Sequence, residues 1–360
     1  MRIVMVSNNY TPYSGGVVSA LDAIIPALHA AGHDVTLITL SFLDNHADDP
    51  SWVVRVPHVG QWLYKKNHIA IPWRSDYHVL RTIKKIAPDI IHSHHPFLLG
   101  NCARKAAHEL KIPLAFTYHT VYEQHAQYLP VPVWLGAPCI KKVVQDYCAQ
   151  ADGIITPSKA VHAHVQRQLP AETCLCVVIP SGLLPVFIPS GAFAPKKRHA
   201  QEPFKLLTVG RFVPEKNMRG LLDLFAQLDQ QRFRFTLIGY GSEFDAVASY
   251  AYDTLGLSSD AVRFMHKPEK TLIAAQYREA DLFLFGSTKD TQGLVLAESM
   301  AAGTPVIACD GPGQRDSVRQ GINGFLVNSI EEMREKIMLL AGNPELHGAL
   351  QEQAFVTAQY

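Results

Sequence analysis

Residues 282–308 read LFLFGSTKDTQGLVLAESMAAGTPVIA, an order of apolar and polar segments that is typical of a strand–helix–strand unit. The apolar runs at 282–285 and 306–308 have the length and composition of buried strands. Between them a polar loop leads into a helix predicted over 294–302. Strands joined through a helix run parallel, so this segment predicts an α/β fold with a parallel sheet.

The same alternation extends over the whole chain. Strands are predicted at 2–7, 34–40, 53–57, 89–93, 114–118, 153–156, 176–179, 205–209, 234–238 and 262–265, and helices at 17–31, 218–230, 243–255, 271–279 and 330–341. The 360 residues suffice for two hydrophobic cores. We therefore predict two doubly wound, Rossmann-like α/β domains that face a cleft. The predicted parts are an N-terminal domain over 1–180, an interdomain linker over 181–203 and a C-terminal domain over 204–360.

The composition excludes several classes of protein. Hydrophobic residues make up 48% of the chain and charged residues 18%, which excludes disordered, collagen-like and coiled-coil chains. The formal net charge of +1 gives no reason to expect a nucleic-acid partner. No apolar run approaches the length of a membrane span, and the chain enters a strand at 2–7 without a signal-peptide layout. We therefore expect a cytoplasmic protein.

The cysteines and histidines do not predict a metal site. The six cysteines lack paired C-x-x-C spacing. His92 and His94 share one face of a predicted strand, and His95 follows them, but no second acidic or imidazole ligand stands at a set spacing. We interpret these histidines as packed or solvent-facing, and we expect neither a metal nor a cofactor.

Two features that follow predicted strands are suited to binding phosphate. Gly15 and Gly16 stand between the first strand and the first helix, where backbone amides can approach a phosphate at the helix N-terminus. Arg211 and Lys216 follow the strand at 205–209, at the sheet edge where ligands of open α/β folds bind. A guanidinium and an ammonium at that edge can together hold the negative charge of a diphosphate.

The loop and helix after the strand at 282–285 combine backbone amides with carboxylates. Asp290 lies in the loop, the helix begins near Gly293, and Glu298 falls just over one turn inside it. The free amides of Gly293, Leu294 and Val295 can face a phosphate. The two carboxylates can accept hydrogen bonds from sugar hydroxyls on either side.

These residues together resemble the retaining family-4 glycosyltransferases of the GT-B fold, which transfer a sugar from a nucleotide donor. The resemblance covers nearly the whole chain. It rests on the Gly15–Gly16 loop, the basic pair, the turn at 238–241 and two acidic residues with seven residues between them. It implies that the diphosphate is bound by Arg211 and Lys216, the ribose hydroxyls by Glu298, the sugar ring by Asp290, and phosphate or sugar by the amides of Gly16, Leu294 and Val295.

The resemblance also implies a mechanism. His119 follows the strand at 114–118 and corresponds to a histidine that the family places beside the transferred sugar. Transfer with retention proceeds on one face of the sugar, and the departing diphosphate oxygen helps to remove the acceptor proton. Asp290 departs from the pattern because the family usually has Glu there, and a side chain shorter by one methylene changes the reach toward the sugar.

The acceptor is suggested by a more specific likeness. The stretches at 117–123, 128–130 and 289–294 are similar to the diacylglycerol glucosyltransferases. This likeness implies UDP-glucose as the donor, a membrane lipid as the acceptor and a position at the inner face of a membrane. The residues suited to a membrane interface are Trp62, Leu63, Tyr64, Lys65, Lys66, Trp73, Arg74, Trp134, Lys141 and Lys142. The sequence equally fits tryptophans packed in the core beside solvated lysines.

Other functions stay open at the level of the sequence. A transferase acting on a soluble sugar or small molecule, and a catalytically weak nucleotide-sugar-binding protein, would use the same fold. A dehydrogenase is disfavoured because no G-x-G-x-x-G follows the first strand. Family members usually end with a helix that crosses back onto the first domain, and the chain stops about where that helix is expected to begin.

Overall fold

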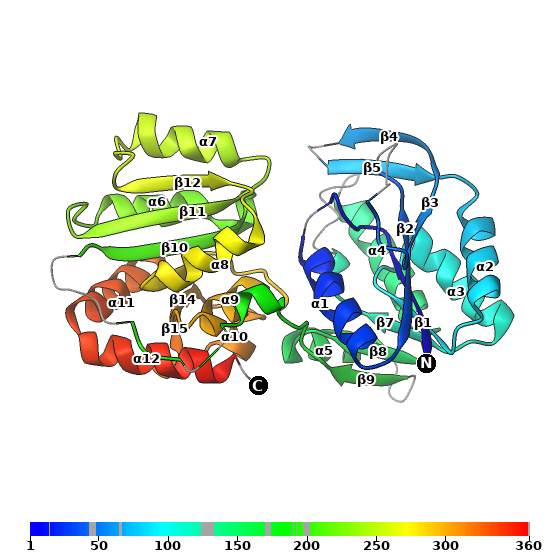
Figure 1. Ribbon diagram of the computed structural model, residues 1–360. Helices are drawn as coiled ribbons and strands as arrows, with labels where there is room; N and C mark the ends of the chain where they lie inside the picture. Colours follow the sequence, from blue (N-terminus) through cyan, green and yellow to red (C-terminus); the bar gives the residue numbers. More distant parts are fainter. Residues whose placement is uncertain are drawn as a thin grey trace. The chain divides into compact units, whose positions relative to one another are not determined.

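The structure is a computed structural model that describes residues 1–13, 15–42, 48–64, 67–123, 133–169, 174–189, 191, 193–196 and 202–358. Contacts divide the chain into two compact units, Met1–Gly182 (unit 1) and Leu183–Tyr360 (unit 2). Each unit is built on a parallel sheet with helices around it (Figure 1). The predicted α/β class with two Rossmann-like domains is therefore confirmed.

The sheet of unit 1 has the strand order β3-β2-β1-β6-β7-β8-β9, and neighbouring strands run parallel. Its strands are β1 (Arg2–Ser7), β2 (Asp34–Leu40), β3 (Val53–Val56), β6 (Ile90–Ser93), β7 (Leu114–Thr117), β8 (Gly153–Thr156) and β9 (Leu175–Val178). Its helices are α1 (Gly16–Ala30), α2 (Ser75–Ile86), α3 (Leu99–Leu110), α4 (Val133–Cys148) and α5 (Lys159–Gln166).

Side chains of the inner strand β1 are buried on both faces of this sheet. Successive residues of a strand point to opposite faces. Met5 packs in a buried cluster with Leu21 of α1, whereas Val4 packs in another cluster with Val79 of α2. Helices therefore cover both faces, which explains why β1 is almost uniformly apolar.

The sheet of unit 2 has the strand order β12-β11-β10-β13-β14-β15. Its strands are β10 (Phe204–Arg211), β11 (Phe233–Tyr240), β12 (Val262–His266), β13 (Leu282–Phe285), β14 (Val306–Cys309) and β15 (Gly324–Val327). Its helices are α6 (Met218–Ala226), α7 (Phe244–Ser249), α8 (Lys270–Glu279), α9 (Leu294–Ala301), α10 (Gln314–Ser317), α11 (Ile330–Gly342) and α12 (Pro344–Thr357). Because β10 pairs in parallel with β13, the carboxyl ends of these two strands are neighbours. The loops that follow β10 and β13 therefore start side by side.

Three parts of the fold differ in detail from the sequence prediction. An antiparallel hairpin of β4 (His58–Tyr64) and β5 (Asn67–Pro72) was not predicted. The helix expected over 243–255 is α7 followed by a π-helical segment, Tyr250–Thr254. Described residues of the predicted linker pack on unit 2, because Phe187 is buried there and the Phe193 ring stacks on Phe355 with centroids 4.7 Å apart.

Candidate active site

Two residues predicted to bind the donor, Lys216 and Asp290, meet where β10 and β13 of unit 2 end. The Lys216 ammonium donates a hydrogen bond to Oδ1 of Asp290, joining the loop after β10 to the loop after β13. The Lys216 and Asp290 side chains are 14% and 22% exposed. Within the described part of the chain, Oδ2 of Asp290 is buried and has no hydrogen-bond partner. A carboxylate with one buried oxygen unoccupied is ready to accept a hydrogen bond from a ligand hydroxyl.

The second predicted cation lies close to this pair along the chain. Arg211 ends β10, and its side chain is 39% exposed. Its guanidinium lies 4.0 Å from the Glu215 carboxylate, while the Lys216 ammonium lies 5.3 Å from the centroid of the Phe285 ring. Lys216 is thus held by an anion and an aromatic face, and Arg211 presents the more exposed positive charge.

Glu298 of α9 is held by a residue that sequence reasoning missed. Its Oε2 accepts a hydrogen bond of 2.9 Å from the hydroxyl of Tyr277 on α8. Burial raises the pKa of Glu298 to about 7, although the Tyr277 hydrogen bond and the Lys270 charge act in the opposite direction. A carboxylate with this pKa changes charge near neutral pH.

The start of α9 supplies the predicted backbone donors. Gly293 adopts a left-handed conformation with φ of 69°, and the helix begins at Leu294. A Cβ atom at Gly293 would lie 2.9 Å from Cδ1 of Leu296. The left-handed backbone conformation and this close approach both favour glycine at the position. The amides of Leu294 and Val295 belong to the first turn, which lacks intrahelical acceptors. They can therefore donate to an anion.

The glycine loop of unit 1 has the predicted form. Gly16 is the first residue of α1, and Gly15 caps it with φ of 159°. No atom would lie within 4 Å of a Cβ atom built at Gly16. The space around Gly16 is therefore open to an approaching ligand, and sterics inside unit 1 do not by themselves require glycine there.

His119 belongs to a cluster of histidines in unit 1. Its Nε2 lies 2.8 Å from Nδ1 of His94, and the two rings are stacked with centroids 5.2 Å apart. Nε2 of His92 lies 2.7 Å from the Thr117 hydroxyl. A hydrogen bond between two imidazoles needs one N–H and one lone pair, so this geometry suits two neutral rings.

Burial keeps this cluster neutral. It lowers the pKa of His119 to about 3, with a smaller contribution from repulsion by His95 and His92. Burial also lowers the pKa of His92 and of His95 to about 4. Within the described residues, no group of three or more histidine, cysteine or acidic side chains is arranged to hold a metal ion. The cluster therefore offers neutral hydrogen-bonding groups at physiological pH.

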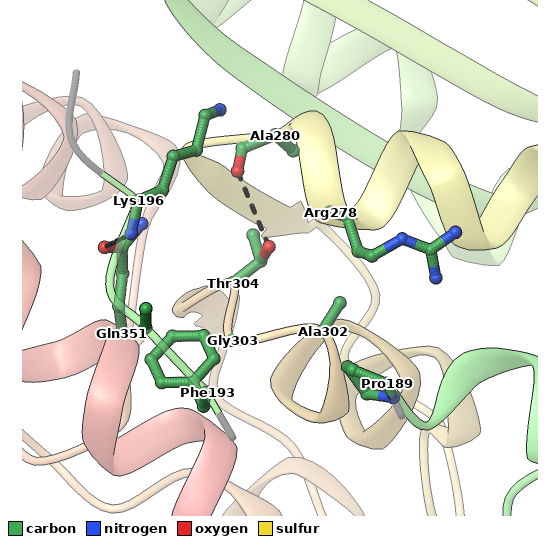
Figure 2. A pocket seen from close by; sticks show the side chains of 10 residues that line it. Pro189, Phe193, Lys196, Arg278, Ala280, Ala302, Gly303, Thr304 and Gln351 are labelled. Atoms are coloured by element: carbon green, nitrogen blue, oxygen red, sulfur yellow. Dashed lines mark hydrogen bonds between the residues drawn. The ribbon is translucent and has the colours of Figure 1, made fainter. Parts of the chain in front are cut away.

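A separate pocket lies at the amino-terminal ends of strands of unit 2, where β13 and β14 begin (Figure 2). Its volume is about 240 Å³, and its lining residues are Pro189, Phe193, Ala194, Lys196, Arg278, Ala280, Ala302, Gly303, Thr304 and Gln351. Lys196 is paired with Asp281 at 3.0 Å. The donor residues predicted in unit 2 follow the carboxyl ends of β10 and β13, so this pocket is not where they lie.

Several of the residues predicted to suit a membrane interface are exposed on unit 1. Trp134, at the start of α4, is 73% exposed, and Trp73, just before α2, is 52% exposed. Lys141 and Lys142 of α4 are exposed as well. Lys65, Lys66 and the stretch 128–130 lie outside the described residues. Of the helices in the described part of the chain, none has the length and apolar character that crossing a membrane requires.

The sequence matches two family models that together span most of the chain. Residues 14–183 match the model described as Glycosyltransferase Family 4, and residues 191–356 match the model described as Glycosyl transferases group 1. Unit 1 and unit 2 thus each correspond to one family model.

Curated proteins of similar sequence include lipid glucosyltransferases. An alpha-monoglucosyldiacylglycerol synthase of Streptococcus pneumoniae is 28% identical over 96% of this chain and 80% of its own length. A protein of the same name from Acholeplasma laidlawii is 27% identical over 100% of this chain and 93% of its own length. A GDP-mannose-dependent alpha-mannosyltransferase of Corynebacterium glutamicum is 28% identical over 92% of this chain and 78% of its own length.

The solved structure of Anabaena HepE in complex with UDP shares the fold. It superposes with a TM-score of 0.76 at 19% identity, and the match covers 100% of this chain and 95% of that one. At this identity the likeness concerns the arrangement of strands and helices alone.

Proposed function

Because the chain belongs to the nucleotide-sugar-dependent glycosyltransferases of the GT-B fold, we propose that it transfers glucose from UDP-glucose, with retention, to a hydroxyl of diacylglycerol. The observation that carries the proposal is the hydrogen bond of Lys216 to Asp290, which joins the loop after β10 to the loop after β13. Glu298 lies on α9, the helix that continues the second loop. The lipid acceptor is supported by the two similar diacylglycerol glucosyltransferases.

We assign donor recognition to unit 2. Arg211 and Lys216 neutralise the diphosphate, and the amides of Leu294 and Val295 donate to its oxygens. Glu298 accepts hydrogen bonds from the ribose hydroxyls. Asp290 accepts them from the sugar ring, for which its buried Oδ2 is available. Each group thus meets the part of the donor that its charge and hydrogen-bonding capacity fit.

Unit 1 supplies the acceptor site and His119 in this scheme. During transfer the bond from the anomeric carbon to the diphosphate breaks, and a bond from that carbon to the acceptor oxygen forms on the same face. The acceptor proton passes to the departing diphosphate oxygen. His119 is neutral because burial lowers its pKa to about 3, so it serves as a hydrogen-bonding group rather than as a general acid. Positioning and charge stabilisation then supply most of the catalysis.

A peripheral contact with a membrane is part of the proposal. The exposed Trp73 and Trp134 can insert into the interface, and Lys141 and Lys142 can contact anionic headgroups. This arrangement would hold unit 1 at the inner face of a membrane, where diacylglycerol is dissolved. Binding to vesicles with and without anionic lipid, compared for the native chain and Trp134→Ser, tests the contact.

An acceptor screen tests the function itself. Radiolabelled UDP-glucose or GDP-mannose is supplied with diacylglycerol vesicles, free sugars or small aglycones, and labelled products are separated into lipid and water-soluble fractions. We expect label in the lipid fraction with UDP-glucose. Label in a soluble sugar would favour the soluble-acceptor alternative, and transfer from GDP-mannose alone would overturn the donor assignment. Donor binding without any turnover would favour the nucleotide-sugar-binding alternative.

A further inference from the structure

Tyr277 is a core residue whose hydroxyl reaches the predicted ribose-binding carboxylate. Its side chain is fully buried on α8, and its ring packs against Phe187 and Phe283 with centroids 5.9 and 5.6 Å away. Its backbone carbonyl accepts a 2.6 Å hydrogen bond from the Thr304 hydroxyl. The ring and backbone are therefore fixed before the hydroxyl meets Glu298.

The hydrogen bond occupies only one of the two oxygens of Glu298. The Tyr277 hydroxyl donates to Oε2 at 2.9 Å, which restricts rotation of the carboxylate. Each oxygen of a carboxylate can accept hydrogen bonds independently. Oε1 is therefore held in a defined direction and is not used by this hydrogen bond.

We propose that Tyr277 is a positioning residue for the donor, fixing the Glu298 carboxylate so that it accepts hydrogen bonds from the ribose hydroxyls. This inference rests on the proposed function, since it assumes that Glu298 binds ribose. Tyr277 acts through Glu298 and is not itself assigned a contact with the donor.

Electrostatics gives the positioning role a measurable consequence. Within the described residues, the groups that face Glu298 and affect its titration are Tyr277 and Lys270, both from α8. Both favour the carboxylate form, whereas burial disfavours it and raises the pKa to about 7. Burial keeps the pKa of Tyr277 well above its ordinary value, so the phenol remains a donor. Removing the hydroxyl therefore raises the pKa of Glu298 further.

The test is calorimetric titration of the full chain with UDP-glucose, without acceptor, from pH 6 to pH 9. The diphosphate of UDP-glucose is used because, unlike the terminal phosphate of UDP, it has no ionisation near pH 7. For the native chain, affinity should fall as pH decreases through about 7, because the ionised carboxylate is a stronger hydrogen-bond acceptor for the ribose hydroxyls than the protonated carboxyl is. In Tyr277→Phe the midpoint should move up by about one pH unit, a typical effect of losing one hydrogen bond to a buried carboxylate. Affinity should then be about fivefold weaker at pH 7 and recover at pH 9.

Two further variants make the result decisive. Tyr250→Phe is a matched control, since the Tyr250 hydroxyl also donates to a carboxylate, that of Asp223 at 2.6 Å, outside the candidate site. It should leave the midpoint unchanged. Glu298→Gln should abolish the pH dependence near 7 while Tyr277 remains intact. This variant tests the assignment of the titrating group even if Tyr277→Phe fails to fold.

The outcomes separate this inference from the proposed function. An unchanged midpoint in Tyr277→Phe, or a loss of affinity equal at every pH, would show that Tyr277 is only a packing residue. Persistence of the midpoint in Glu298→Gln would also overturn the inference. Native protein that binds no UDP-glucose at any pH would instead contradict the proposed function.

Discussion

The ion pair between Lys216 and Asp290 predicts that one substitution strengthens nucleotide binding while it weakens catalysis. In the structure the Asp290 carboxylate forms an ion pair with the Lys216 ammonium, which is the group assigned to bind the diphosphate. A nucleoside diphosphate must therefore compete with Asp290 for Lys216. Asp290→Asn keeps the shape of the side chain but removes this competing charge, and the same change removes the anion assigned to the sugar.

The burial of the pair sets the size of the effect. Its side chains are 14% and 22% exposed, so its strength lies between that of exposed pairs, at about 0.5 kcal/mol, and that of buried charged hydrogen bonds, at about 1.5 to 3 kcal/mol. A value of about 1 kcal/mol corresponds to UDP binding about fivefold more tightly in Asp290→Asn. Turnover should fall about 100-fold, as for the loss of a group that positions the transferred sugar.

Calorimetric titration with UDP alone measures the first effect, and initial rates with UDP-glucose measure the second. Asp290→Glu is the control, because it keeps the charge and should leave UDP affinity within about twofold. In a Lys216→Ala background the gain from Asp290→Asn should disappear. Equal or weaker UDP binding by Asp290→Asn would refute the competition. The rate of Asp290→Glu shows whether the shorter carboxylate limits this enzyme or is matched to its substrate.

Three other predictions concern catalysis, metal dependence and stability. His119→Ala should lower kcat about 100-fold but change the Kd for UDP less than about threefold. In the native chain, the pH profile of kcat should show no titration of His119 from pH 5 to pH 8, because burial lowers the pKa of His119 to about 3. Dialysis against EDTA should leave the initial rate unchanged, because Arg211 and Lys216 are assigned the neutralisation of the diphosphate; a rate restored only by Mg²⁺ would contradict this assignment. Gly239→Ala would place Cβ 1.8 Å from the Gly210 carbonyl oxygen, so urea denaturation should show a loss of more than about 2 kcal/mol, and an unchanged midpoint would contradict the packing.

The sequence predicted the parts of the fold that depend on local pattern. The apolar run at 282–285 coincides with β13, and the helix predicted over 294–302 ends within one residue of α9, Leu294–Ala301. The hairpin of β4 and β5 was missed because its strands carry histidine, glutamine and glycine rather than a continuous apolar run. It pairs antiparallel, outside the alternation that guided the prediction.

The same distinction applies to the candidate site. Arg211, Lys216 and Asp290 were predicted because each follows a predicted strand, and Glu298 because it lies just over one turn inside the helix that comes next. Tyr277 could not be predicted, since its partner Glu298 lies 21 residues away and nothing in α8 marks its hydroxyl as functional. For the histidine cluster of unit 1, the sequence indicated only that His92 and His94 share one face of a strand. The contact of His94 with His119, 25 residues away, required the register of β6 against β7.

The lipid product tests the central claim most directly. The full chain is incubated with UDP-glucose labelled at the anomeric carbon and vesicles containing diacylglycerol, and the anomeric signal of the extracted lipid is recorded by NMR. Retaining transfer predicts glucosyldiacylglycerol with the α configuration of the donor, and Lys216→Ala should diminish that signal. A β-linked product, or label recovered only in water-soluble sugars, would contradict the account.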